Sequence, residues 1–100
     1  MSQEEIITKV KEAVEEDPNK DYIQSISLFG SFLHGDAKKD SDVDLLYETK
    51  KTMTLFQIAR THYNLEQKLK KKVDFVDKDS VISQLKDEII PTARKIYEKK

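Results

Sequence analysis

The chain has 100 residues, of which 37% are hydrophobic and 37% are charged, so it can close one modest core beneath a highly charged surface. Its 18 basic and 19 acidic side chains leave a net charge of -1, which offers no general attraction to a long nucleic acid or an anionic membrane. The absence of cysteine excludes disulfides and thiolate metal sites and leaves any metal to oxygen or imidazole ligands.

We expect a single domain over residues 1–100, because a core of this size does not divide into two. No stretch of the sequence reaches the roughly 20 apolar residues that a membrane span needs. The first residues also lack the basic and apolar segments of a signal peptide. These features predict a cytoplasmic protein.

The first predicted elements are a helix, a strand and a glycine-containing loop. A capping box followed by apolar residues at helical spacing predicts a helix over residues 3–16. Apolar and polar side chains alternate with a period close to two over residues 22–29, which predicts a strand that ends at Gly30. Both glycines of the chain lie in the segment 30–40, which we expect to be a loop with one helical turn.

The middle of the chain predicts two further strands joined by a long helix. Residues 43–47 read as a strand, and the short connection before them favours antiparallel pairing with the first strand. A second capping box and an apolar stripe that includes Leu55 predict a helix over residues 55–70. Residues 73–76 form a third short strand.

The C-terminal part gives weaker signals. Ser80 is a candidate cap for a helix that runs through Val81 and Ile82. Pro91 follows, and beyond it the sequence is consistent with either a kinked helix or an edge strand at residues 95–97.

Two aspartates flank Val43 at the start of the second strand. Because side chains alternate along a strand, Asp42 and Asp44 point to the same face, about 7 Å apart at their Cα atoms. Such a pair repels, and a cation of high charge density such as Mg²⁺ favours the state in which both are ionised. An isolated Asp-x-Asp is also common in solvated turns.

Other parts of the sequence complete a candidate site. Gly30-Ser31 follows the first strand, where a missing side chain lets phosphate oxygens approach backbone amides and the Ser31 hydroxyl. Asp74 lies between core residues of the third strand and would add a third carboxylate if that strand pairs with the second. Asp77 is its rival.

These residues carry a resemblance to a known family. The run Gly30-Ser31-Phe32-Leu33-His34-Gly35, its spacing to Ser41-Asp42-Val43-Asp44-Leu45, and the later Val73-Asp74-Phe75-Val76 resemble the minimal nucleotidyltransferase branch of the polymerase-beta-like superfamily. His34 stands where that family often has arginine. The resemblance spans nearly the whole chain.

The resemblance implies an α+β fold, with a small mixed sheet backed by helices as in the polymerase-beta palm. It implies that Asp42, Asp44 and Asp74 hold two Mg²⁺ ions and that Gly30, Ser31 and Ser41 bind the nucleotide. The donor would be ATP. Many members resemble the antitoxin of a pair whose toxin is a helical HEPN ribonuclease, which they silence by adding AMP to a tyrosine.

We therefore expect a Mg²⁺-dependent nucleotidyltransferase that adenylylates a partner protein. One alternative is a non-catalytic antitoxin-like partner that inhibits a toxin by complex formation. The other is transfer to a small-molecule acceptor, which needs additional pocket walls. Lys38 and Lys39 are candidates for attracting the triphosphate electrostatically. His34 is more simply interpreted as a solvated residue, and His62 as a packing residue.

Overall fold

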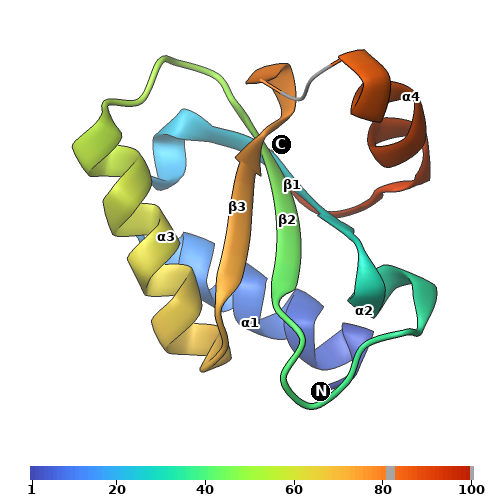
Figure 1. Ribbon diagram of the computed structural model, residues 1–100. Coiled ribbons are helices and arrows are strands. Elements are labelled where there is room, and N and C mark those ends of the chain that lie inside the picture. Colours follow the sequence, from blue (N-terminus) through green and yellow to red (C-terminus); the bar gives the residue numbers. More distant parts are fainter. Residues whose placement is uncertain (81–82, 100) are drawn as a thin grey trace.

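The computed structural model describes residues 1–80 and 83–99, which form a four-stranded mixed sheet with surrounding helices (Figure 1). The elements in chain order are α1 (Gln3–Glu16), η1 (Lys20–Tyr22), β1 (Ile23–Phe29), α2 (Ser31–His34), β2 (Val43–Thr49), α3 (Leu55–Leu69), β3 (Val73–Asp77), η2 (Lys78–Ser80), α4 (Ser83–Thr92) and β4 (Arg94–Glu98). The expected α+β class is confirmed.

The sheet has the strand order β3-β2-β1-β4. β1 pairs antiparallel with both β2 and β4, whereas β2 and β3 are parallel. A parallel pair needs a long crossover, and α3 supplies it. The expected antiparallel pairing of the first strand with the second is confirmed. The third strand lies beside the second, which is the condition on which Asp74 joins the candidate site.

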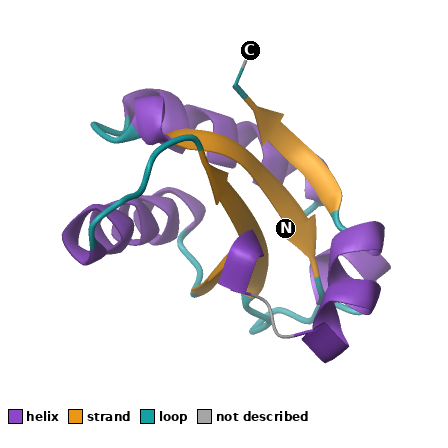
Figure 2. Ribbon diagram, turned by 90° about the horizontal axis from the view of Figure 1, so that it is seen from above, coloured by secondary structure: helices purple, strands orange, loops and turns teal. Residues whose placement is uncertain are grey.

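One face of the sheet packs against α1 and α3. Side chains that alternate along the strands point to this face, and they meet an apolar stripe from each helix. α1 crosses behind the sheet and α3 lies beside β3 (Figure 1). The core comprises Ile6, Val10, Ala13, Val14, Ile23, Ile26, Leu28, Phe32, Val43, Leu45, Tyr47, Met53, Leu65, Leu69, Val73 and Ile96. Seen from above, α4 lies across the sheet from α3 (Figure 2).

The predicted long helix needs two corrections. Leu55 is 83% exposed, so it does not belong to the buried stripe, because the first turn of α3 extends beyond the edge of the core. The helix also ends at Leu69, one residue before the expected end. Lys70 caps it in the left-handed conformation with φ 55°.

The C-terminal segment resolves an open alternative. Residues 94–98 are the edge strand β4, which pairs with β1. The helix before it is described from Ser83 onward, and the predicted residues Val81 and Ile82 lie outside the described residues. None of the described helices combines the length and apolar character that crossing a membrane requires.

Candidate active site

Three strands bring their chemically important ends to one edge of the sheet. The register places Phe29 of β1 opposite Asp44 of β2, and Asp44 opposite Asp74 of β3. Neighbouring strands lie about 4.8 Å apart, so Asp44 and Asp74 are direct neighbours across the parallel pair. Gly30-Ser31 follows Phe29 and therefore begins at the same edge; it leads into α2, which lies at the level of the lower end of β2 in Figure 1.

Asp44 is the central residue of this edge. Val43 and Leu45 on either side of it are both fully buried in the core, so strand alternation turns Asp44 to the opposite face. Burial raises the pKa of the Asp44 carboxyl, and the negative charges of Asp74 and Asp42 raise it further; a hydrogen bond from the Ser31 backbone N–H acts in the other direction. The site therefore concentrates negative charge that a bound cation would relieve.

Position 30 requires glycine, because its backbone lies against the Asp44 carboxylate and leaves no room for a Cβ atom. Its backbone, at φ 74° and ψ -152°, lies in a region that is essentially restricted to glycine. A Cβ added there would overlap the Asp44 carboxylate oxygen and lie 2.8 Å from its Cγ. The Gly30-Ser31 turn and the carboxylate consequently lie in direct contact, as the sequence spacing suggested.

The loop between α2 and β2 carries the other candidate residues. Asp42 immediately precedes β2 and is exposed, and its charge acts on Asp44. The Ser41 hydroxyl accepts a hydrogen bond of 2.8 Å from the Lys38 backbone N–H, so in this structure it stabilises the loop. His34 and Lys38 are exposed.

The structure distinguishes Asp74 from Asp77, the alternative candidate for the third carboxylate. Asp77 lies opposite Tyr47 at the far end of β3, on the other face of the sheet, and its charge helps burial to raise the pKa of the Tyr47 hydroxyl. Asp74 is exposed and adjacent to Asp44. Of the two, only Asp74 is placed to join the carboxylates at the sheet edge.

The donor set of this edge matches a hard cation. It offers carboxylate oxygens from neighbouring backbone positions, which is the ligand type that Mg²⁺ prefers. Among residues 1–80 and 83–99, no three carboxylate or imidazole groups already stand close enough together to hold a metal ion. Because Asp44 and Asp74 are paired through the sheet, rotation of their side chains would suffice to bring carboxylate oxygens to a shared ion.

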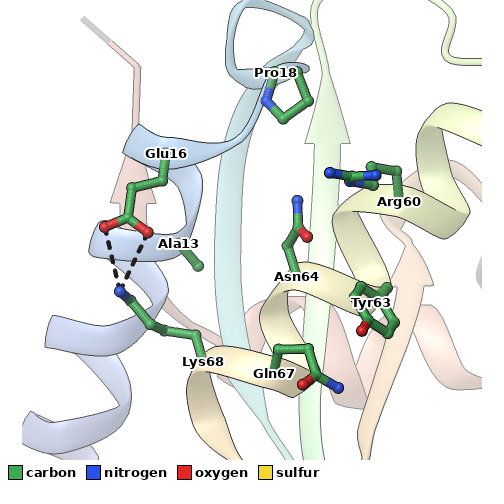
Figure 3. A pocket seen from close by; sticks show the side chains of 8 residues that line it. All are labelled: Ala13, Glu16, Pro18, Arg60, Tyr63, Asn64, Gln67 and Lys68. Carbon is green, nitrogen blue, oxygen red and sulfur yellow. Dashed lines mark hydrogen bonds and ion pairs between the residues drawn. The ribbon is translucent and has the colours of Figure 1, made fainter.

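The surface has a hollow that lies away from this edge of the sheet. It has a volume of about 360 Å³ and lies between the end of α1 and the outer side of α3, lined by residues that include Arg60, Tyr63 and Asn64. Figure 3 shows Lys68 and Glu16 paired across it, at 3.2 Å. None of the candidate site residues lines this hollow, so we do not assign the chemistry to it.

His62 has a structural role beyond the packing expected from sequence. Its Nε2 lies 2.6 Å from the Val73 carbonyl oxygen, and its ring packs against Phe75. Glu66, one turn along α3, accepts a hydrogen bond of 2.9 Å from the Val73 backbone N–H. Together these side chains bind α3 to the start of β3 and so fix the strand that carries Asp74.

Sequence reasoning missed two side chains that contact the loop of the candidate site. Gln3 of α1 donates to the carbonyls of Phe32 and Leu33, and Lys71 donates to the carbonyl of Lys39. Their partners are backbone atoms far away in the chain, so no local pattern identifies these contacts. The only available hint was the position of Lys71, three residues before Asp74.

Comparisons with known proteins agree with this arrangement. The family model described as polymerase beta, nucleotidyltransferase matches residues 8–100. A candidate protein adenylyltransferase of Methanocaldococcus jannaschii is 35% identical over 71 residues, which cover 71% of this chain and 76% of that protein.

Solved structures share the fold. A crystal structure of a toxin-antitoxin with AMP-PNP matches with a TM-score of 0.76 at 21% identity, over 94% of this chain and 74% of that chain. A complex of a tri-AMPylated HEPN toxin with its MNT antitoxin from Shewanella oneidensis matches with a TM-score of 0.69 at 20% identity, over 97% and 73% of the two chains.

Proposed function

The chain belongs to the polymerase beta nucleotidyltransferase family, and we propose that it is a Mg²⁺-dependent protein adenylyltransferase, which transfers AMP from ATP to a hydroxyl of a partner protein. The observation that carries this proposal is the contact of Asp44 with the Gly30-Ser31 turn on one side and its pairing with Asp74 on the other. Because ATP is a cytoplasmic metabolite, we propose that the reaction takes place in the cytoplasm.

Each part of the site has a distinct task in this proposal. Gly30 and Ser31 bind the β- and γ-phosphates, because the turn presents backbone without a side chain; Ser41 adds a hydroxyl. Asp42, Asp44 and Asp74 would hold two Mg²⁺ ions, and Asp74 would either hold the ion nearest the acceptor or take the acceptor's proton. Bound Mg²⁺ would neutralise the triphosphate and lower the pKa of the attacking hydroxyl.

We propose that the acceptor is a helical HEPN-type toxin. One of the matched structures is described as an AMPylated HEPN toxin with its MNT antitoxin, and one of the sequence relatives as a candidate protein adenylyltransferase. The candidate carboxylates support a protein acceptor because Asp42 and Asp74 are exposed at the sheet edge. A docked protein could present a hydroxyl there and position it through its own surface.

Transfer of label provides the test. The chain, Mg²⁺ and α-labelled ATP are incubated with the protein encoded by the neighbouring gene, and the product is analysed by intact mass. We expect one or more AMP units on that protein, and none with Asp44→Asn. A tight inhibitory complex without label would instead support the non-catalytic partner, and label on an added small molecule alone would support the third alternative.

Metal dependence of ATP binding tests the site itself. Without Mg²⁺ the carboxylates face a polyphosphate of the same sign, so we expect ATP to bind weakly until the metal is added. Isothermal titration calorimetry with and without a chelator measures the difference. Equal affinity in both conditions would refute a metal-bridged nucleotide site.

A further inference from the structure

The one-turn helix α2 cannot hold its own position. It has four residues, far fewer than an isolated helix needs to be stable in water. Its last carbonyl groups have no partner within the helix, and it is followed by Gly35, where an added Cβ would meet nothing within 4 Å. The turn that begins at Gly30 must therefore be held by contacts with the rest of the fold, of which the burial of Phe32 in the core is one.

Gln3 supplies one of these contacts from the first turn of α1. Its Nε2 donates to the carbonyls of Phe32 and Leu33, at 3.1 Å each. Its Oε1 accepts a hydrogen bond of 2.7 Å from Arg94 of β4. Because Arg94 has only donors, this bond keeps the amide nitrogen of Gln3 turned toward α2.

Lys71, which lies between α3 and β3, supplies the second contact. Its Nζ donates to the Lys39 carbonyl at 2.7 Å and lies 5.6 Å from the centroid of the Phe32 ring, within the range of a cation–π contact. Phe32 is buried in the core, and it is held in addition through its carbonyl by Gln3 and through its ring by Lys71. The neighbouring Lys72 is exposed.

We infer that Gln3 and Lys71 are positioning residues for the nucleotide, because they clamp the loop that carries Gly30-Ser31 at its start and Asp42 at its end. This inference rests on the proposed function of that loop as the phosphate-binding segment. Neither side chain needs to touch the nucleotide. Their effect is to hold the turn in a binding-competent position before ATP arrives, which lowers the ordering cost of binding.

Two readouts test the inference together. Lys71→Met keeps the length of the side chain but removes the ammonium group, and Gln3→Ala removes the amide. We expect each to weaken MgATP binding roughly tenfold while lowering the melting temperature by no more than about 4 °C. Amide hydrogen exchange without nucleotide should quicken at Asp36, Lys38 and Ser41, whose N–H groups bond within the loop.

Matched variants control for the loss of charge and of a helical glutamine. Lys72→Met and Gln67→Ala change exposed residues and should behave as wild type in both readouts. Lys71→Arg keeps a cationic donor and should recover most of the affinity.

The remaining outcomes refute the inference in distinguishable ways. Weaker binding with unchanged exchange would mean that Lys71 contacts the nucleotide directly. Quicker exchange with unchanged binding would mean that the contacts are only structural. If wild type does not bind MgATP at all, the proposed function fails and the inference falls with it, whereas wild-type affinity in every variant refutes the inference alone.

Discussion

Replacing Gly30 by alanine separates backbone strain from the contact with Asp44, because the second glycine of the chain provides the reference. Gly35 also has a positive φ, 80°, but a Cβ there would meet nothing within 4 Å. Gly35→Ala should therefore cost only left-handed strain, about 1 kcal/mol of the free energy of unfolding.

Gly30→Ala should cost considerably more. Its backbone lies in a more restricted region, at about 1–3 kcal/mol for a non-glycine residue. The new Cβ would also overlap the Asp44 carboxylate and force it to move, and overpacking of this kind costs about 1–3 kcal/mol. We expect a total near 4 kcal/mol, out of roughly 5–15 kcal/mol for a whole domain.

Urea unfolding of a double-mutant cycle checks this reasoning. In the Asp44→Ala background the carboxylate is absent, so Gly30→Ala should cost about 2 kcal/mol less than in wild type. Gly35→Ala should cost the same in both backgrounds. If Gly30→Ala proves additive with Asp44→Ala, or no more costly than Gly35→Ala, the close approach of the turn to Asp44 is not the reason for glycine at this position.

Two further changes should stabilise the metal-free protein. The pKa of Asp44 is raised above its ordinary 3.8, so the ionised carboxyl opposes folding as pH rises through the folded-state pKa. Asp44→Asn should raise the free energy of unfolding at pH 7 by less than about 1 kcal/mol, because solvent screens the charge. The gain, followed as a rise in melting temperature, should vanish below pH 3.8; a gain that persists in acid would contradict the electrostatic cause. Lys70→Gly should add about 0.5–1 kcal/mol by relieving left-handed strain, measured by urea unfolding, whereas Lys72→Gly should add nothing; equal effects would exclude that cause.

The elements predictable from sequence are those whose signals are local. The first helix was placed at its observed bounds because a capping box and an apolar stripe both lie within it. The antiparallel pairing of the first two strands followed from their short connection, and it brought Gly30 to Asp44. Asp74 could be placed beside them only on the assumption that the third strand pairs with the second.

The features that sequence could not supply depend on distant contacts. Periodicity placed Leu55 on a buried stripe, but it cannot show that the core ends before the first turn of α3. The sequence after Pro91 is consistent with both a kinked helix and an edge strand. Only the pairing with β1 selects the strand. Gln3 and Lys71 are ordinary polar residues in the sequence, and their partners are backbone carbonyls about 30 residues away in the chain.

The parallel pairing of β2 with β3 makes the candidate site a late product of folding. β1 and β2 can pair across a short loop, whereas β3 reaches β2 only after the chain has closed around α3, and such long closures are entropically slower. Asp44 and Asp74 therefore become neighbours only when the edge strand β3 docks on β2. A cation that prefers the assembled carboxylates would stabilise this docked state over a partly folded one, so metal binding would report on the docking of β3 against β2.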